Sequence, residues 1–287
     1  MWSLSYGESL PVNPDFDLEA YLTRIGHRGP RDADLATLAA IQHGHTHTLA
    51  FENLDPWLGR PVALDLAALQ HKLVWQRRGG YCYEHNLLLG AALRALGYPV
   101  IDLAARVRWN MPAGLVRPRT HMLLLVGLGD DRFIVDAGFG GRTLTGPLAL
   151  GRRGPQATPH GRFRVQRGDG AWAVQVDLAA GGWTTLYTFT LEPQLLADYE
   201  MTSWYLCQHP DSIFRQSLVA ARPDAEGRWT LRDTQLSLHR ADGSVETTTL
   251  RSVDAFRDAL ATRFGLDASP LDGLDARLAV LAANAPD

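Results

Sequence analysis

The sequence predicts an α+β protein of three lobes: an N-terminal helical bundle (1–97), a central antiparallel β-barrel (98–192) and a C-terminal α/β lobe (193–287). Apolar residues recur at helical spacing in the first third, and at Tyr98 the spacing changes to the alternation of half-buried strands. After Pro193 the two patterns are mixed. A chain of 287 residues, 46% of them hydrophobic, is long enough to bury more than one core.

Four helices are expected in the first lobe. Asp17 and Asp65 are suitable N-caps, and glycines 26, 79, 80 and 97 are suitable stops. The apolar face of the first helix consists of Leu18, Tyr21, Leu22 and Ile25, and that of the second of Leu35, Leu38 and Ile41. The third helix has Leu66, Leu69 and Leu73 on one face. The fourth starts near Cys82 and has Leu87, Leu88, Ala91 and Leu96.

Strands are expected throughout the second lobe. Ile101, Leu103, Ala105, Val107 and Trp109 alternate with more polar residues, as in a strand with one buried face. Further strand-like runs cover 120–126, 132–137, 162–166, 172–177 and 183–189. Such a block of short strands predicts a small antiparallel barrel or curled sheet.

The third lobe mixes strands and helices. The runs 229–238 and 245–250 predict a hairpin that turns at 241–243. Helices are expected from Ser252 onward and over about 272–283.

Composition excludes several function classes. The net charge is −3, and the arginine pairs at 77–78 and 152–153 are too short for a basic stripe, so we expect solvated surface pairs and no nucleic-acid partner. The N-terminus lacks a signal-peptide pattern and no apolar run is long enough for a membrane span, which predicts a cytoplasmic protein without a membrane partner. Two cysteines make no disulfide framework. The oligomeric state stays open, with a homodimer as one option.

Cys82 lies where the pair Gly79-Gly80 ends and a helix begins. The first turn of a helix carries unpaired N–H groups and a partial positive charge, which favours ionisation of a thiol there. The glycines let the backbone bend sharply and would let a substrate approach the sulfur. The alternative is a buried structural cysteine, because free cysteine is among the most buried residue types.

His121 and Asp136 supply a second feature. If the strands at 120–126 and 132–137 form a hairpin centred between Leu128 and Gly129, His121 lies directly opposite Asp136. The carboxylate would then orient the imidazole. A thiol that can ionise, a base and an orienting acid are the parts of activated thiol catalysis, although a histidine that is merely hydrogen-bonded at a strand end fits the same pattern.

A zinc site is the rival interpretation of this region. Cys82 and His85 are three residues apart on a helix, and the histidines at 43, 45 and 47 could add nitrogen ligands. No second pair is placed to complete four ligands, so we expect no metal. Cys207 follows no glycine turn, and packing is its expected role.

Four segments resemble the arylamine N-acetyltransferase family: AFENLD at 50–55, RGGYCYEHN at 78–86, THMLL at 120–124 and VDAGFG at 135–140. They occur in the family's order, and the segment that contains Trp204-Tyr205, His209-Pro210 and Phe214 resembles the family's third lobe. The resemblance implies a helical bundle, a β-barrel and an α/β lid around a cysteine-protease-like Cys-His-Asp core. It covers nearly the whole chain.

By this resemblance Cys82 is the acetyl-accepting nucleophile, His121 the base and Asp136 its orienting partner. Acetyl-coenzyme A is the implied donor, and arylamines, arylhydrazines or N-hydroxyarylamines are the implied acceptors, in a ping-pong reaction. The implied coenzyme A contacts are Thr120, Gly138, Phe139, Gly140 and Phe214. The implied acceptor pocket contains Phe51, Tyr83, Phe139 and Phe214.

Three other functions are alternatives for a chain with these residues. A macrolactam-forming amide synthase of the same fold would use an acyl chain from another carrier. A transglutaminase- or protease-like thiol hydrolase would use water as acceptor. A non-catalytic binding module would have lost a member of the Cys-His-Asp set, and none is missing here.

Overall fold

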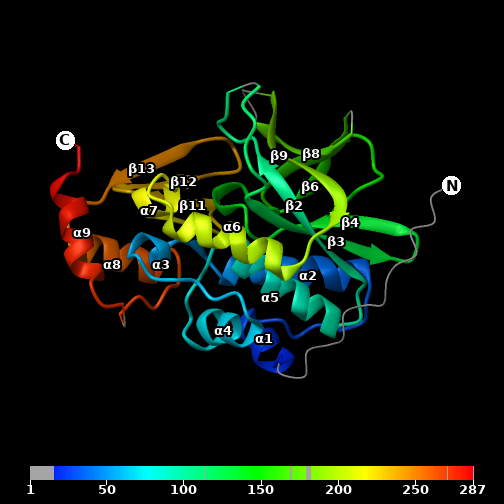
Figure 1. The fold of residues 1–287 in the computed structure, drawn as a ribbon, viewed down its shortest axis with the longest axis horizontal. Coiled ribbons are helices and arrows are strands. Elements are labelled where there is room, and N and C mark those ends of the chain that lie inside the picture. The colour runs from blue at the N-terminus through cyan, green and yellow to red at the C-terminus, as the bar shows by residue number, and fades with distance from the viewer. Residues whose placement is uncertain (1–15, 113, 169, 179–181, 270, 287) are drawn as a thin grey trace.

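The computed structural model describes residues 16–112, 114–168, 170–178, 182–269 and 271–286. It confirms an α+β fold in which helices precede a curled antiparallel sheet and a second sheet follows (Figure 1). The first third contains α1 (Leu18–Arg24), α2 (Leu35–Thr48), α3 (Leu54–Trp57), α4 (Leu66–Gln70), the π-helical turn η1 (His71–Trp75) and α5 (Cys82–Ala95). Asp17 and Asp65 cap α1 and α4 as expected, by accepting N–H groups of the first turn.

Eight antiparallel strands form a nearly closed barrel. The strands are β2 (Val100–Val107), β3 (His121–Leu128), β4 (Asp131–Val135), β5 (Leu148–Ala149), β6 (Gln156–Thr158), β7 (Gly161–Arg167), β8 (Trp172–Leu178) and β9 (Gly182–Pro193), in the order β5-β4-β3-β2-β9-β8-β7-β6. The Gln156 side chain bonds to both the N–H and the C=O of Ala149, at 2.8 and 3.0 Å, and so joins the two edge strands β6 and β5.

Strand β3 is covered on both faces, which explains its nearly continuous apolar sequence. Met122, Leu124 and Val126 pack against the helices, whereas Leu123 and Leu125 belong to the core inside the barrel. His121 is two residues before Leu123 on the same strand, so its side chain lies on the same face, toward the inside of the barrel. The alternation of Leu103 and Ala105 toward the same core is confirmed.

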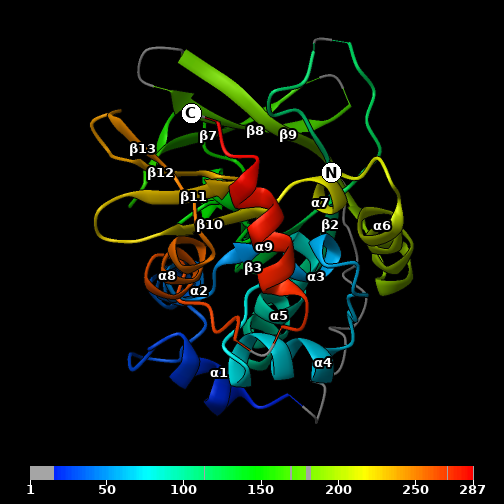
Figure 2. The ribbon, with the colours of Figure 1, turned by 90° about the vertical axis from the view of Figure 1, so that its left-hand side faces the viewer.

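The second sheet combines one strand from the first third of the chain with four strands from the last third. Its order is β1 (Phe51–Glu52), β10 (Val219–Pro223), β11 (Arg228–Arg232), β12 (Gln235–His239) and β13 (Val245–Thr249), and it packs with α3, α8 (Val253–Thr262) and α9 (Leu274–Ala283) (Figure 2). The prediction of a single strand over 229–238 was wrong. It is two strands that turn at Asp233, which has φ = +51°.

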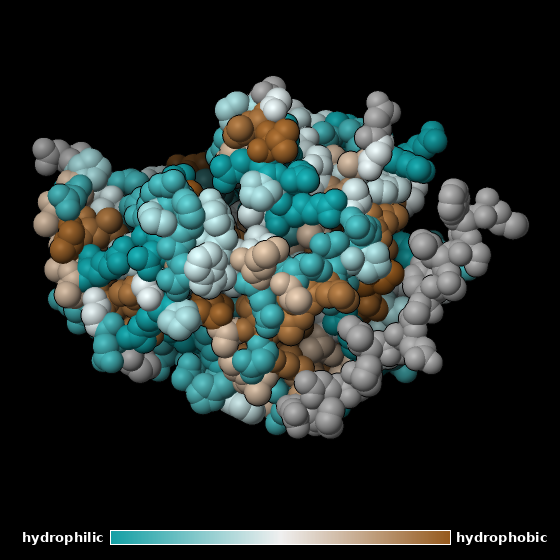
Figure 3. Space-filling model, viewed as in Figure 1, coloured by the Kyte–Doolittle hydropathy of each residue, from teal (hydrophilic) through white to brown (hydrophobic). Residues whose placement is uncertain are grey.

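The sequence patterns also missed α6 (Leu196–Gln208) and the short α7 (Ile213–Gln216). Helix α6 exposes Met201 and Trp204, which weakens its apolar periodicity. On the face shown in Figure 3, hydrophobic residues gather in separate groups among hydrophilic ones. Within the described ranges, no helix has the length and apolar character needed to cross a membrane.

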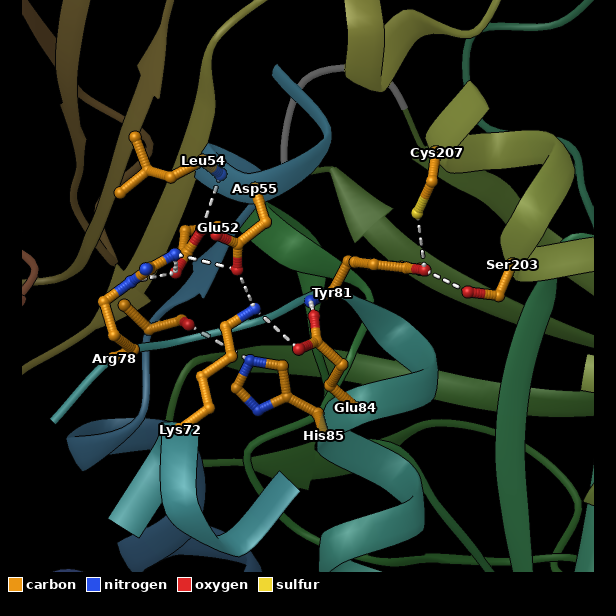
Figure 4. Close-up of polar contacts among 11 residues, drawn as sticks. Glu52, Leu54, Asp55, Lys72, Arg78, Tyr81, Glu84, His85, Ser203 and Cys207 are labelled. Carbon is orange, nitrogen blue, oxygen red and sulfur yellow. Dashed lines mark hydrogen bonds and ion pairs between the residues drawn. The ribbon is translucent and has the colours of Figure 1, made fainter. Parts of the chain in front are cut away.

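A buried cluster of charges lies under the start of α5 (Figure 4). Lys72 Nζ is 2.6 Å from carboxylate oxygens of both Asp55 and Glu84, and Arg78 pairs with Glu52 at 2.7 Å. Burial raises the pKa of Glu84 to about 7, against the opposing effect of Lys72. Since each charge has an opposite partner, the cluster can exist away from water and fixes η1 against α5.

Replacing Lys72 with Met should therefore lower the free energy of unfolding by about 3–5 kcal/mol, because it leaves buried carboxylates without their cation. The loss should grow as the pH rises above about 7, because removing Lys72 raises the folded-state pKa of Glu84 further, and the variant keeps losing stability where Glu84 of the wild type is already ionised. Urea denaturation measures both effects.

The matched control is Arg257→Met, which removes a solvent-exposed pair with Asp275. This change should cost less than about 1 kcal/mol. Equal losses in the two variants would contradict a structural role for the buried cluster.

Candidate active site

Cys82 is the first residue of α5 and is 4% exposed. Its Sγ is 3.7 Å from the carbonyl oxygen of Thr120, at the start of β3. The helix therefore directs its N-terminal end, with its unpaired N–H groups and partial positive charge, at the point where β3 begins.

The glycine pair before Cys82 serves close packing. A Cβ on Gly79 would lie 2.0 Å from the Ala50 carbonyl oxygen, and one on Gly80 would lie 2.6 Å from a carboxylate oxygen of Glu84. Gly80 forms a parallel bridge with Phe51, and the N–H of Glu52 donates to its carbonyl at 2.8 Å. These glycines therefore dock strand β1 against the turn, and their role in letting a substrate approach the sulfur stays a prediction.

His121 and Asp136 do meet, but not in the register expected. The turn is Gly129-Asp130, with Leu128 opposite Asp131 and Leu124 opposite Val135, so the strand pairing is displaced by two residues from the prediction. Because side chains repeat every two residues along a strand, this displacement keeps both side chains on the same face. Asp136 is the diagonal neighbour of His121, and its Oδ2 is 2.8 Å from His121 Nε2.

The Asp136 carboxylate is fully buried and is held by three segments of the chain. Besides His121, its Oδ1 accepts the N–H of Gly138 at 2.8 Å and the amide of Asn86 at 3.1 Å. Burial opposes ionisation, but His121 and these donors more than offset it and lower the pKa of Asp136. The carboxylate is therefore negative at neutral pH.

Asn86 was not identified from the sequence as a site residue. It lies one helical turn after Cys82, and its Nδ2 also donates to the Met122 carbonyl at 2.7 Å, while its Oδ1 accepts the N–H of Ala137 at 3.0 Å. One amide thus joins α5, β3 and the segment that carries Asp136. The i, i+4 spacing from Cys82 was the available signal, because such residues share a helix face.

His121 is held in its charged form. Burial lowers the pKa of its imidazole, but Asp136 and a hydrogen bond with the Cys82 side chain raise it to about 10. The imidazole thus interacts with the acid on one side and the thiol on the other. This arrangement can hold a thiolate beside an imidazolium and can give or take one proton.

Aromatic rings surround this pair. The rings of Phe139 and Tyr187 lie 5.0 and 4.8 Å from that of His121. Burial and the charge of Asp136 raise the pKa of the Tyr187 phenol. Tyr187 was also missed, because it lies on β9, more than sixty residues from His121 in sequence, and comes close only because β9 pairs with β2, the neighbour of β3.

The other expected pocket residues lie on two sides of the site. Phe51 contacts Phe214, with ring centroids 6.0 Å apart, and borders Gly140. Tyr83 is buried and packs against Tyr81 and against Tyr199 of α6. Thr120, Phe139 and Phe214 are partly exposed, whereas Gly138 and Gly140 are buried.

His85 points away from Cys82 and ends a buried chain. Its Nε2 donates to the Ala50 carbonyl, so its Nδ1 accepts from His45 Nε2 at 2.9 Å, and His45 Nδ1 in turn accepts from the Tyr21 hydroxyl at 2.9 Å. Both histidines are neutral, because burial lowers the pKa of His45 and brings that of His85 to about 4. Every polar atom of the two rings is occupied, and the described residues contain no cluster of three or more His, Cys, Asp or Glu side chains suited to a metal ion.

Cys207 is buried on α6, which agrees with its expected packing role. Its Sγ is 3.2 Å from the Tyr81 hydroxyl, which also bonds to Ser203 (Figure 4). Burial raises the pKa of this thiol, which makes it a poor nucleophile.

Gly138 sets the distance between the Asp136 segment and α5. A Cβ there would lie 2.5 Å from Cys82 Cα and 2.9 Å from Asn86 Nδ2, both far inside contact distance. Gly138→Ala should therefore cost about 1–3 kcal/mol of stability through overpacking. It should also change the rate at which iodoacetamide modifies Cys82, because the backbone that carries the thiol must move.

Gly168→Ala is the control, since a Cβ there would lie at an ordinary 3.7 Å from the Ala171 carbonyl oxygen. It should leave both the urea midpoint and the alkylation rate unchanged. The same behaviour from Gly138→Ala would contradict the close packing of this segment on α5.

Known proteins resemble this chain over most of its length. A family model described as N-acetyltransferase matches residues 34–271. The arylamine N-acetyltransferase of Mycolicibacterium smegmatis is 44% identical over 270 residues, which are 92% of this chain and 97% of that protein. A Salmonella typhimurium protein named arylamine N-acetyltransferase / N-hydroxyarylamine O-acetyltransferase is 38% identical over 87% of this chain and 88% of its own.

Solved structures of arylamine N-acetyltransferases also have the same fold as this chain. The Mycobacterium marinum arylamine N-acetyltransferase in complex with CoA superimposes with a TM-score of 0.88 at 38% identity, over 92% of this chain and 99% of that one. The Mycobacterium tuberculosis arylamine N-acetyltransferase gives a TM-score of 0.87 at 40% identity, over 91% of this chain and 99% of that one. The chain therefore belongs to the arylamine N-acetyltransferase family.

Proposed function

We propose that this chain transfers an acetyl group from acetyl-coenzyme A to arylamines, arylhydrazines or N-hydroxyarylamines through an acetyl-Cys82 thioester. The observation that carries the proposal is the 2.8 Å bond between His121 and the ionised Asp136, next to a cysteine at a helix N-terminus. Membership of the family supports the donor and the acceptor class.

In the first half-reaction the Cys82 thiolate attacks the carbonyl carbon of the acetyl thioester. A bond forms between that carbon and Sγ, the bond to the sulfur of coenzyme A breaks, and the His121 imidazolium can protonate the leaving thiolate. The backbone N–H of Cys82 is placed to stabilise the oxyanion. One thioester replaces another, so the step is close to balanced in energy.

In the second half-reaction the acceptor nitrogen attacks acetyl-Cys82. The neutral His121 now takes the proton of the amine, and the Cys82 thiolate leaves, which restores the imidazolium–thiolate pair. Asp136 stays ionised throughout, and holds the imidazole in one orientation. The aromatic side chains of Phe51, Phe139 and Phe214 would keep water from the thioester.

The coenzyme must reach Cys82 from the partly exposed side of the site. Thr120 and Phe139 are the expected residues on that side, and both flank His121 or Cys82. Gly138 and Gly140 are buried against α5 and Phe51, so we propose that they shape this wall through their backbone.

The proposal predicts a burst with p-nitrophenyl acetate equal in amount to the enzyme, followed by slow turnover that an added arylamine accelerates. Cys82→Ser should abolish the burst. Asp136→Asn should slow it by at least about 100-fold, because general acid–base assistance contributes about 10²–10⁴. Asp177→Asn, on the outside of the barrel, should leave it unchanged.

The rival functions give other results. Turnover that arylamines do not accelerate would indicate a thiol hydrolase. A burst with the ester but no acetylation by acetyl-coenzyme A would indicate an amide synthase that uses another donor. A wild-type rate in Asp136→Asn would contradict the role of the His121–Asp136 pair.

A further inference from the structure

The Arg152-Arg153 pair, expected to be a solvated surface pair, has a third arginine beside it. The pair lies in the loop between β5 and β6, and Arg167 is at the end of β7. Together with Trp172 and the glycines of the loop, these arginines line a cavity of about 590 Å³. The antiparallel β6–β7 hairpin brings the loop alongside the end of β7, because Gln156 lies opposite Phe163 and Arg167 is four residues beyond Phe163.

The described residues that line this cavity carry charges of one sign: three arginines and no carboxylate. Elsewhere on the barrel and the second sheet, exposed Arg162 and Arg240 each pair with an acidic residue. Among the residues whose positions are described, no carboxylate pairs with Arg152, Arg153 or Arg167.

The cavity and His121 lie on different parts of the barrel wall. Trp172 pairs with Phe189 of β9, Phe189 with Ala105 of β2, and Ala105 with His121 of β3, so Trp172 is three strands from His121 on one row.

At about 4.8 Å between neighbouring strands, Trp172 is roughly 14 Å from His121 around the barrel wall. The interior between them is filled by packed side chains that include Leu123, Leu125 and Phe163. A small molecule bound at Cys82 therefore cannot reach the arginine cavity through the barrel.

We infer that this cavity binds a phosphate-bearing small molecule of nucleotide size. Guanidinium groups bind phosphate oxygens in pairs, and three of them suit a ligand with several negative charges. The Trp172 ring, which lies 5.7 Å from the Arg167 guanidinium, offers a flat surface for a heterocycle. The volume is within the range of small-molecule sites. A hollow lined by three cations suits a compact anion, whereas a nucleic-acid backbone needs an extended basic stripe.

Isothermal titration calorimetry with ATP, inorganic triphosphate and adenosine tests this inference. ATP and triphosphate should bind the wild-type protein, with affinity that falls as salt is raised, and adenosine should not bind. The double variant Arg153→Ala/Arg167→Ala should bind ATP at least about tenfold more weakly, a loss of about 1.4 kcal/mol. The double variant Arg28→Ala/Arg232→Ala, with the same net charge and changes on exposed residues elsewhere, should bind as the wild type does.

Equal ATP affinity in the two double variants, or binding of adenosine alone, would overturn the inference. The p-nitrophenyl acetate burst of Arg153→Ala/Arg167→Ala should remain that of the wild type, because the cavity is separate from Cys82. A lost burst would contradict that separation. Since the burst reports on the proposed acetyl transfer and calorimetry on the cavity, failure of one proposal is distinguishable from failure of the other.

Discussion

The site depends on keeping one carboxylate ionised where there is no water. Asp136 is fully buried, and a charge in that position is unfavourable unless fixed donors surround it. Its donors come from β3 through His121, from α5 through Asn86 and from its own turn through Gly138. The charge is therefore stable only when helix, strand and turn are packed together, and the same packing places Cys82 beside His121.

Patterns of period two and 3.6 predicted most of the longer helices, most barrel strands and the faces they bury. They also brought His121 and Asp136 together for a reason that was partly wrong: the hairpin turns at Gly129-Asp130, displaced by two residues from the register expected. The pairing survived because a displacement of two preserves the face of each side chain. A displacement of one would have put His121 among the helices.

Contacts between distant segments could not be predicted from local patterns. Tyr187 joins the site because β9 pairs with β2, the neighbour of β3. The sequence around Lys72 is that of a surface residue, but the structure places its Nζ 2.6 Å from two carboxylates. The glycines of the nucleophile turn were expected to let a substrate approach the sulfur, and Gly138 to contact the coenzyme. Their close packing was not predicted: at each of them a Cβ would meet the backbone or a side chain of a neighbouring segment.

The most direct measurement is an NMR titration of the His121 imidazole, assigned by comparison with His121→Gln. Its pKa of about 10, raised from about 6.5 by Asp136 and Cys82 against the effect of burial, predicts a charged ring at about pH 8 in the wild type and a neutral one in Asp136→Asn. The bond should thus stabilise the fold fully below about pH 6.5 and progressively less as the pH rises toward 10. A wild-type ring that titrates at or below about 6.5 would contradict the account, because Asp136 would not be holding the imidazolium.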